Sequence, residues 1–365
     1  MIRKKIKIYY KTLVQLFFKI IYGKILLPKN VNNLLKKEKI DNKIFRSFKN
    51  NHYNFYKIKD ARIFTDNNEN VAIIKNNFIL PFVSFQQING KLKNVKYNSV
   101  LKFGTPSFAK KIRGKVFNLC QGDSGNNYFH FIFDIIPKIY LLTTKKKLNK
   151  INYFYLTNPK EWQIKILKKL GIKENNILSS KDNNHIIADE IYAVDHPWYD
   201  SGFVQFNLNK IPEWIISHNR KIFLENKKKK ITQKIFLDRS NSKFNHCQIE
   251  NISELMKLIK KKKIKNYKPE LLSFKNQIKL FNTSSMVIGA HGAAFTNIIF
   301  CRPGTKVIEI MPSDHPNEKC KRISKILNLK YYRIETKPIN SDKNFPFKII
   351  LDNKKLKSIE KIINL

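Results

Sequence analysis

Acidic residues are scarce in this chain of 365 residues. The 27 Asp and Glu residues are outnumbered by 71 Lys and Arg, which gives a formal net charge of +44. An excess of this size is typical of nucleic-acid-binding proteins. The commonest residues, however, are Lys, Asn and Ile, whose codons are rich in A and T. A biased base composition would raise the charge without selection for a polyanion, so the charge alone does not indicate nucleic-acid binding.

Cysteine is also scarce, and its positions predict neither a zinc site nor a disulfide framework. Cys120, Cys247, Cys301 and Cys320 lie far apart and form no C-x-x-C pair, which fits a reducing cytoplasm. Hydrophobic residues make up 42% of the chain and aromatic residues 12%. The composition therefore predicts a folded protein that is long enough for two cores.

Several catalytic motifs are absent. The sequence has no G-x-x-x-x-G-K-[ST] of a P-loop nucleotidase, no G-x-G-x-x-G of a dinucleotide dehydrogenase and no G-x-S-x-G of an esterase. It also has no D-x-D, the usual motif that holds a divalent metal on a sugar nucleotide. We therefore expect neither a cofactor nor an essential metal.

No uninterrupted apolar run approaches the roughly 20 residues that span a bilayer. The first segment, MIRKKIKIYYKTLVQLFFKIIYGKILLPKN, is apolar and aromatic but is broken by lysines, and no small-residue cleavage site follows it. Residues 1–27 instead predict a basic, aromatic, amphipathic helix. Two interpretations stay open: the helix lies on an anionic membrane surface, or it packs on its own domain.

The pattern of strands and helices predicts an α/β protein. After Lys230 strands and helices alternate regularly, as in a parallel sheet covered on both faces. We expect three regions: an N-terminal segment and linker (1–48), an N-terminal domain (49–215) and a C-terminal domain (216–365), whose last helix packs back on either half. Strands are predicted near 71–85, at 115–120, 152–157, 185–194, 234–239, 263–268, 285–290, 306–311 and 330–335, and helices at 159–171, 212–226, 249–261, 273–281, 317–327 and 352–364.

The turn GAHGAAFTN (289–297) follows a predicted buried strand and opens a predicted helix. Small residues there, including Gly292 and Ala293, let a ligand approach the backbone. The free N–H groups of the helix favour an anion, and His291 and Asn297 could donate hydrogen bonds to phosphate or sugar. The competing interpretation is that His291 is an ordinary core histidine.

Two basic residues and one acidic residue complete this candidate site. Arg239 and Lys243 follow another strand and could hold a diphosphate, Arg239 through its bidentate fork. Glu309 lies in an otherwise apolar strand, where its charge needs compensation. It could accept hydrogen bonds from ribose hydroxyls or pair with a core lysine.

A second candidate site lies in GDSGNNYFHFIFDIIPKIYLL (122–142). On a helix, Asn127, His130, Asp134 and Lys138 form one polar stripe on an apolar cylinder. His130 and Asp134 are suited to act as a base and its orienting group, although a buried structural pair is the alternative. Pro137 would break the helical backbone bond to Phe133.

The segments NYFHFIFDIIPKIYLL, FLDRSNSK and LSFKNQIKLFNTSSMVIGAHGAAFTNIIFCRPGTKVIEI resemble glycosyltransferase family 61 in order and spacing, over about residues 115–335. The resemblance implies a GT-B architecture, with two Rossmann-like halves and parallel sheets facing across a cleft. It places His130 and Asp134 on the family's H-x-x-x-D positions, Arg239 on its donor-binding arginine and His291 on the histidine of its H-G-A motif. Lys243 stands where an arginine is common.

The resemblance also implies an inverting transfer, without an essential metal, from a nucleotide sugar to a glycan or lipid-linked glycan in surface or capsular polysaccharide synthesis. Either His130 or Asp134 would be the base. The expected location is the cytoplasm, with the inner face of the cell membrane as a candidate surface and no nucleic acid as partner. Two alternatives stay open: a basic nucleic-acid-binding protein and a catalytically degenerate scaffold of the same fold.

Overall fold

The chain folds into two compact units, which a computed structural model describes for most residues. Unit 1 comprises Met1–Val204 and unit 2 comprises Gln205–Leu365, and each is described by itself. The division precedes the predicted boundary at 215/216, so the helix that contains that boundary lies wholly in unit 2. The structure describes residues 2–46, 52–66, 70–88, 90–121, 124–198, 201–225, 231, 233–240, 247–313, 315–339 and 348–365.

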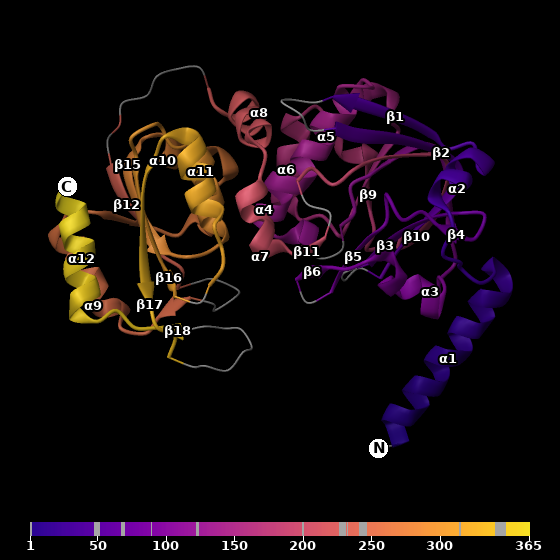
Figure 1. Ribbon diagram of the computed structural model, residues 1–365, viewed down its shortest axis with the longest axis horizontal. Helices are drawn as coiled ribbons and strands as arrows, with labels where there is room; N and C mark the ends of the chain where they lie inside the picture. The colour runs from indigo at the N-terminus through magenta and orange to yellow at the C-terminus, as the bar shows by residue number, and fades with distance from the viewer. Residues whose placement is uncertain are drawn as a thin grey trace. The chain divides into compact units, whose positions relative to one another are not determined.

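Unit 1 contains a mixed sheet, which among the described residues has 11 strands with the main order β11-β6-β5-β3-β2-β10-β7-β8-β9 (Figure 1). The strands β10, β7, β8 and β9 run parallel, whereas β2 pairs antiparallel with β1, β3 and β10. The expectation of a purely parallel sheet is therefore wrong for this unit. Its strands are β1 (Asp41–Arg46), β2 (His52–Thr65), β3 (Asn70–Lys75), β4 (Phe78–Ile79), β5 (Phe85–Ile88), β6 (Lys91–Leu92), β7 (Lys110–Asn118), β8 (Tyr153–Leu156), β9 (Ile177–Ser179), β10 (His185–Val194) and β11 (Gly202–Phe203).

The strands β1 and β2, which the sequence analysis did not predict, are one source of this difference. The region before residue 70 holds a short helix and the antiparallel strands β1 and β2. The side chains of β2 alternate between buried and more exposed only in parts of its length. The alternation is interrupted at Phe55 and Tyr56, which are both buried, near Asp60, which has a positive φ of 46°, and at the buried end of the strand. The many Asn and Lys residues hid this strand, because they occupy its outward positions.

The helices of unit 1 largely follow the predicted pattern. The helix predicted at 159–171 spans Glu161–Lys169, between Pro159 and Gly171, in keeping with the preference for Pro near the start and Gly after the end. None of the described helices of the chain is long and apolar enough to cross a bilayer. The helices of unit 1 are α1 (Ile2–Tyr22), α2 (Val31–Lys37), α3 (Ser99–Phe103), α4 (Tyr128–His130), the π-helix η3 (Phe131–Ile135), α5 (Ile136–Thr143) and α6 (Glu161–Lys169).

Unit 2 is built on a parallel sheet, which over the described residues has five strands in the order β14-β12-β15-β16-β17. In chain order this is 2-1-3-4-5, a doubly wound arrangement of Rossmann type. The predicted alternation of strands and helices is confirmed here. The elements are α7 (Val204–Asn207, which crosses the boundary), α8 (Glu213–Phe223), β12 (Gln233–Leu237), β13 (Gln248–Ile249), α9 (Ile252–Lys261), β14 (Lys265–Tyr267), α10 (Phe274–Asn282), β15 (Ser284–Ala290), the 3₁₀ helix η8 (Ala293–Phe300), β16 (Lys306–Pro312), α11 (Lys319–Leu327), β17 (Lys330–Thr336), β18 (Lys348–Ile349) and α12 (Asn353–Asn364).

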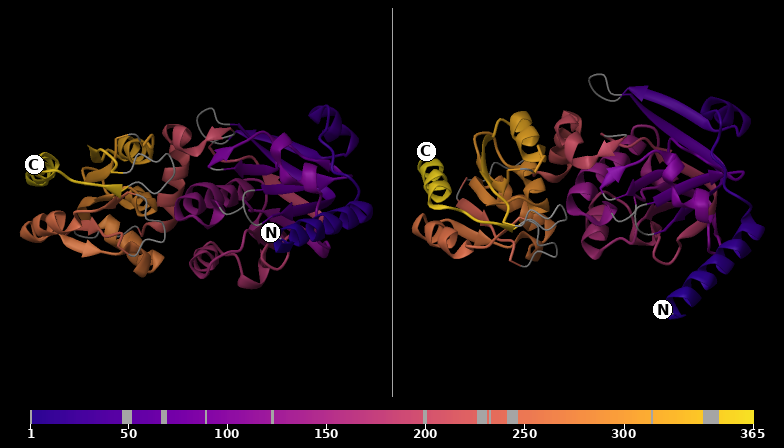
Figure 2. Two further views of the ribbon diagram at one scale, coloured as in Figure 1. Left: turned by 90° about the horizontal axis from the view of Figure 1, so that it is seen from below. Right: turned by 60° about the horizontal axis from the view of Figure 1, so that its bottom comes forward.

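Helices cover both faces of this sheet. The helices α9 and α12 lie on one side and α10 and α11 on the other (Figures 1 and 2). Leu255 of α9 and Ile359 of α12 share one apolar core with Met286, Ile288 and Ile308 of the sheet. The last helix therefore packs on unit 2. On the other side η8 contacts α8, α10 and α11.

Gly289 in β15 gives a test of the close strand packing in unit 2. A Cβ atom at Gly289 would lie 2.9 Å from Leu237 Cβ and 3.1 Å from the Leu237 carbonyl oxygen. We expect Gly289→Ala to lower the free energy of unfolding by about 1–3 kcal/mol through overpacking, seen as a lower urea midpoint. Gly125→Ala is the matched control, because its Cβ would meet nothing closer than Gln121 Cβ at 4.0 Å. Equal midpoints for the two variants would contradict this packing.

Candidate active site

The predicted site residues of unit 2 gather where parallel strands end. From β12 the chain first adds β14 on one side of β12 and then adds β15 on the other side. The order in which strands are added to the sheet therefore reverses between β12 and β15. In open α/β sheets, ligands bind outside the carboxyl ends of the strands at such a reversal. Arg239 follows β12 and His291 follows β15, so both lie at this point.

The guanidinium of Arg239 lies directly against the backbone of Gly292. A Cβ atom at Gly292 would stand 2.1 Å from Nη1 of Arg239 and 2.6 Å from its Cζ. A residue with any side chain would therefore displace the arginine. Gly292 has an extended backbone, with φ 172°, so close approach and not backbone strain explains the glycine. The Nζ of Lys319 donates to the Gly292 carbonyl oxygen at 3.2 Å, which brings a second cation to this turn.

His291 and Glu309 form a buried hydrogen-bonded pair in the same region. The Nδ1 of His291 lies 2.6 Å from Oε1 of Glu309. The carboxylate also accepts from Cys320 Sγ at 3.1 Å and, on its other oxygen, from Tyr331 Oη at 2.7 Å. These protein donors compensate the buried charge of Glu309. The carboxylate is therefore placed to orient the ring of His291.

The surroundings set the charge state of this pair. Burial by itself would raise the pKa of Glu309, but the neighbouring His291 and the hydrogen bonds from His291, Cys320 and Tyr331 lower it to about 2. Burial lowers the pKa of His291, against the opposing effect of Glu309. A neutral His291 that donates from Nδ1 to the carboxylate directs its Nε2 away from Glu309.

Two residues of this cluster were missed by the sequence analysis. Lys319 is buried, and burial lowers the pKa of its ammonium group. The ring of His315 lies 4.6 Å from that of His291, centroid to centroid, and burial lowers its pKa to about 4. Both follow the carboxyl end of β16, and that position in a parallel sheet was the signal that could have identified them.

The remaining donor-site predictions have different outcomes. Asn297 is buried in η8, and its Nδ2 donates to Gln277 Oε1 at 2.8 Å, which ties η8 to α10. Ala293 begins η8. The helix predicted there is a 3₁₀ helix and not an α-helix, so its peptide dipoles are less well aligned than we expected. Lys243 lies outside the described residues.

His130 and Asp134 are brought together in unit 1 as predicted. The Nδ1 of His130 donates to Oδ2 of Asp134 at 2.7 Å, and Asp134 is fully buried. The helix widens here into the π-helix η3, in which the N–H of Ile136 bonds to Phe131 O. Pro137, which has no N–H, follows this wide turn. Asn127 belongs not to a catalytic stripe but to the helix cap, where its Oδ1 accepts from the Phe129 N–H.

Asp134 has further partners that sequence analysis missed. Gln121 Nε2 donates to Oδ2 at 3.0 Å and Trp198 Nε1 donates to Oδ1. The Nε2 of His196 lies 3.5 Å from Oδ2. Burial by itself would raise the pKa of Asp134, but the neighbouring His130 and His196, with their hydrogen bonds, hold it below its ordinary value. The carboxylate is therefore ionised and enclosed by donors.

These partners come from the carboxyl ends of two neighbouring parallel strands. Gln121 follows β7, and His196 and Trp198 follow β10, which pairs with β7. The order of strands in the sheet reverses here too, since β8 lies on one side of β7 and β10 on the other. In the sequence, the motif DHPW directly after the predicted strand at 185–194 could have identified His196 and Trp198 as site residues. Lys138, also buried nearby, has its pKa lowered by burial to about 8, with Asp134 opposing the shift.

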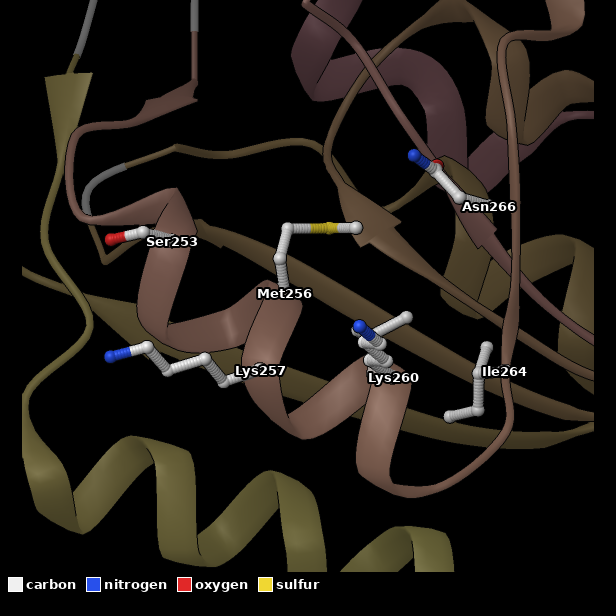
Figure 3. Close-up of a pocket in the computed structure, with 7 residues that line it drawn as sticks. Ser253, Met256, Lys257, Lys260, Ile264 and Asn266 are labelled. Carbon is white, nitrogen blue, oxygen red and sulfur yellow. The ribbon is translucent and has the colours of Figure 1, made fainter.

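A further pocket in the described residues, with a volume of about 520 Å³, is lined by residues of α9, β14 and the loop between them, and none of the predicted site residues is among them (Figure 3). It is largely apolar, and its lining residues are Ser253, Met256, Lys257, Ile259, Lys260, Ile264 and Asn266. No group of three or more His, Cys, Asp or Glu side chains in the described parts of the chain is arranged to hold a metal ion.

Unit 2 thus has the fold of a Rossmann-like protein, with a basic cluster at the strand ends where such sheets bind ligands. Residues 128–308 match the model of the family Glycosyltransferase 61, and the chain belongs to this family. The match contains His130, Asp134, Arg239 and His291. A Beta-1,2-xylosyltransferase RCN11 from Oryza sativa subsp. japonica is 36% identical over 63 residues, which are 17% of this chain and 12% of the rice protein.

The buried Glu309 gives a pH-dependent prediction. Its folded-state pKa of about 2 lies below the ordinary value of 4.5, so its contribution to stability is present above about pH 4.5 and is lost as the pH falls toward 2. We expect Glu309→Gln to lower the free energy of unfolding at pH 7 by about 1–3 kcal/mol. Urea unfolding at several pH values should show this difference shrinking in acid.

The matched control for this prediction is Glu335→Gln in β17. Glu335 is exposed and pairs with Arg333 at 2.7 Å, and exposed pairs contribute about 0–1 kcal/mol. Equal effects of the two substitutions at pH 7, or a Glu309→Gln effect that does not change with pH, would show that the charge of Glu309 does not stabilise the fold.

Proposed function

We propose that this protein is an inverting, metal-independent glycosyltransferase that moves a hexose or pentose from a nucleotide sugar to a glycan or lipid-linked glycan. The observation that carries the proposal is the position of Arg239 against the Gly292 turn, at the strand reversal of unit 2. Membership of family 61 and the xylosyltransferase name of the rice relative support it. Surface or capsular polysaccharide synthesis is the proposed role, and the cytoplasm the proposed location.

The donor's diphosphate would bind at this turn of unit 2. Arg239 offers a planar fork of N–H donors that matches phosphate oxygens. Lys319 adds a buried cation beside the carbonyl of Gly292. His291, held by Glu309, would donate from Nε2 to a phosphate oxygen when protonated, and would accept a hydroxyl hydrogen there when neutral. These groups would stabilise the charge that develops on the leaving diphosphate. No metal ion is needed in this scheme, because the cations come from side chains.

The acceptor's proton would go to His130 in unit 1. Both oxygens of Asp134 already accept hydrogen bonds from protein donors, and the carboxylate is fully buried. His130 donates from Nδ1 to Asp134, so its Nε2 is the nitrogen suited to take a proton. Of the two residues left open by the sequence, we therefore assign the base to His130 and the orienting role to Asp134.

The proposed reaction is a single displacement. The acceptor hydroxyl oxygen forms a bond to the anomeric carbon while His130 takes its proton. The bond between the anomeric carbon and the diphosphate oxygen breaks from the opposite face, so the configuration is inverted. Unit 1 would present the acceptor and unit 2 the donor, as in the two halves of a GT-B enzyme.

Nucleotide binding is the first test. We expect a nucleoside diphosphate, or the nucleotide-linked xylose that the rice relative suggests, to raise the melting temperature, with about 2.7 kcal/mol of stabilisation at a hundredfold excess over Kd. EDTA should leave the shift intact. Arg239→Ala should abolish most of it, because a charge-assisted contact to phosphate is lost.

Arg302→Ala is the control, because Arg302 precedes the amino end of β16, at the opposite edge of the sheet. The absence of a shift with any nucleotide would exclude donor binding, and a shift that EDTA removes would exclude metal independence. A stronger shift with single-stranded nucleic acid than with nucleotides would favour the nucleic-acid alternative.

The role of His130 is tested by separating turnover from binding. We expect His130→Gln to reduce the release of nucleoside diphosphate, with water as acceptor, by about 10²–10⁴-fold, while the melting shift with nucleotide stays. His52→Gln, on the exposed start of β2, is the control. If His130→Gln keeps full turnover, or loses nucleotide binding while folded, His130 is not the base. Nucleotide binding without turnover in the unaltered protein would favour a degenerate scaffold.

A further inference from the structure

Helix α1 exposes its apolar side to solvent. With about 100° between successive residues of an α-helix, eight large apolar or aromatic side chains between Ile6 and Ile21 fall within one continuous arc of about 140°. All of them are exposed: Ile20 is 84% exposed, Tyr9 70%, Tyr10 69% and Leu13 65%, and the others are Ile6, Leu16, Phe17 and Ile21. We call this set the α1 apolar arc.

The opposite side of α1 attaches to unit 1. The ring of Phe18 packs edge-on against Phe108 at 4.9 Å between centroids, and the Tyr22 hydroxyl accepts from the Ala109 N–H at 2.7 Å. The Arg62 guanidinium lies over the Tyr22 ring. These contacts fix the C-terminal end of α1, whose N-terminal part extends from the unit (Figures 1 and 2). The helix therefore packs on its own domain through Phe18 and Tyr22, as one of the two interpretations expected, while the α1 apolar arc stays exposed.

The charges around the α1 apolar arc have one sign. Lys5, Lys7, Lys11 and Lys19 all lie outside the arc on the helix surface, and the sequence has no Asp or Glu before Glu38. An exposed apolar face needs a partner, and this one is surrounded by uncompensated positive charge. A partner must therefore combine an apolar interior with negative charge.

A second copy of this chain does not meet that requirement. Two α1 helices packed through their arcs would bring their lysines together with no acidic residue of α1 to pair with them, and like charges at such a distance repel. An anionic bilayer surface supplies both parts, acyl chains for the arc and headgroups for the lysines. Aromatic side chains such as Tyr9 and Tyr10 also favour the boundary between headgroups and acyl chains.

We propose that α1 docks the protein on an anionic lipid surface, with the α1 apolar arc inserted among the lipids and the lysines at the headgroups. Unit 1 then stays bound through the Phe18 and Tyr22 contacts. This inference does not depend on the proposed catalytic activity, and it gives a transferase with a lipid-linked acceptor a direct route to its substrate.

The test is co-sedimentation of the full chain with vesicles. We expect binding to phosphatidylcholine vesicles that contain about 30% phosphatidylglycerol, and weak binding to phosphatidylcholine alone. Raising NaCl from about 50 mM to about 500 mM should weaken the binding through charge screening. Ile20→Glu should weaken it at least about tenfold more than Thr12→Glu does. Both variants add the same charge, but Ile20 lies in the α1 apolar arc and Thr12 is exposed outside it.

Two outcomes would overturn the proposal. The first is equal vesicle binding by Ile20→Glu and Thr12→Glu, which would leave no role for the arc. The second is a dimer of the unaltered chain, seen by light scattering, that Ile20→Glu dissociates while neither protein binds vesicles. Because Ile20 is 84% exposed, we expect Ile20→Glu to leave the melting temperature unchanged.

Discussion

The charge of a buried carboxylate has to be compensated, and in each unit a histidine supplies much of this compensation. Asp134 and Glu309 are out of reach of water, where an uncompensated charge would cost several kcal/mol. Each is held by a histidine Nδ1 and by neutral donors such as Trp198 or Tyr331. The same hydrogen bonds fix the histidine ring and its tautomer, and so they determine which nitrogen faces a ligand.

The parts of these sites that could be predicted from sequence are those that interrupt an apolar run. Glu309 in a buried strand and the pair His130 and Asp134 on an apolar helix stand out because their neighbours are Ile, Phe and Leu. The regular alternation after Lys230 predicted the parallel sheet of unit 2, and a parallel sheet fixes where the functional edge lies. Arg239 and His291 could therefore be placed together although they are far apart in the chain.

The parts that could not be predicted depend on contacts between distant segments. His196, Trp198 and Lys319 lie in polar segments, and only strand pairing brings them to the carboxylates. The antiparallel strand β2 was hidden because Asn54, Lys57 and Lys59, at its more exposed positions, resemble the polar residues of the rest of a lysine-rich chain. The π-helix at Phe131–Ile135 could not be foreseen either, since Pro137 indicates a broken hydrogen bond but not how the helix accommodates it.

A positive charge in this chain indicates a binding partner only where its placement is energetically unfavourable. A lysine on the surface is solvated at little cost in free energy, so in a sequence of this composition it does not indicate a partner. Lys319 is different, because burying an ammonium group is costly, and Lys319 lies beside the Gly292 turn that Arg239 also contacts. The lysines of α1 are informative for another reason, since they border an exposed apolar arc that water solvates poorly. The two anions proposed above, a phosphate in unit 2 and a lipid surface at α1, would account for these two groups of cations better than one extended polyanion would, because Lys319 is buried and the lysines of α1 are not.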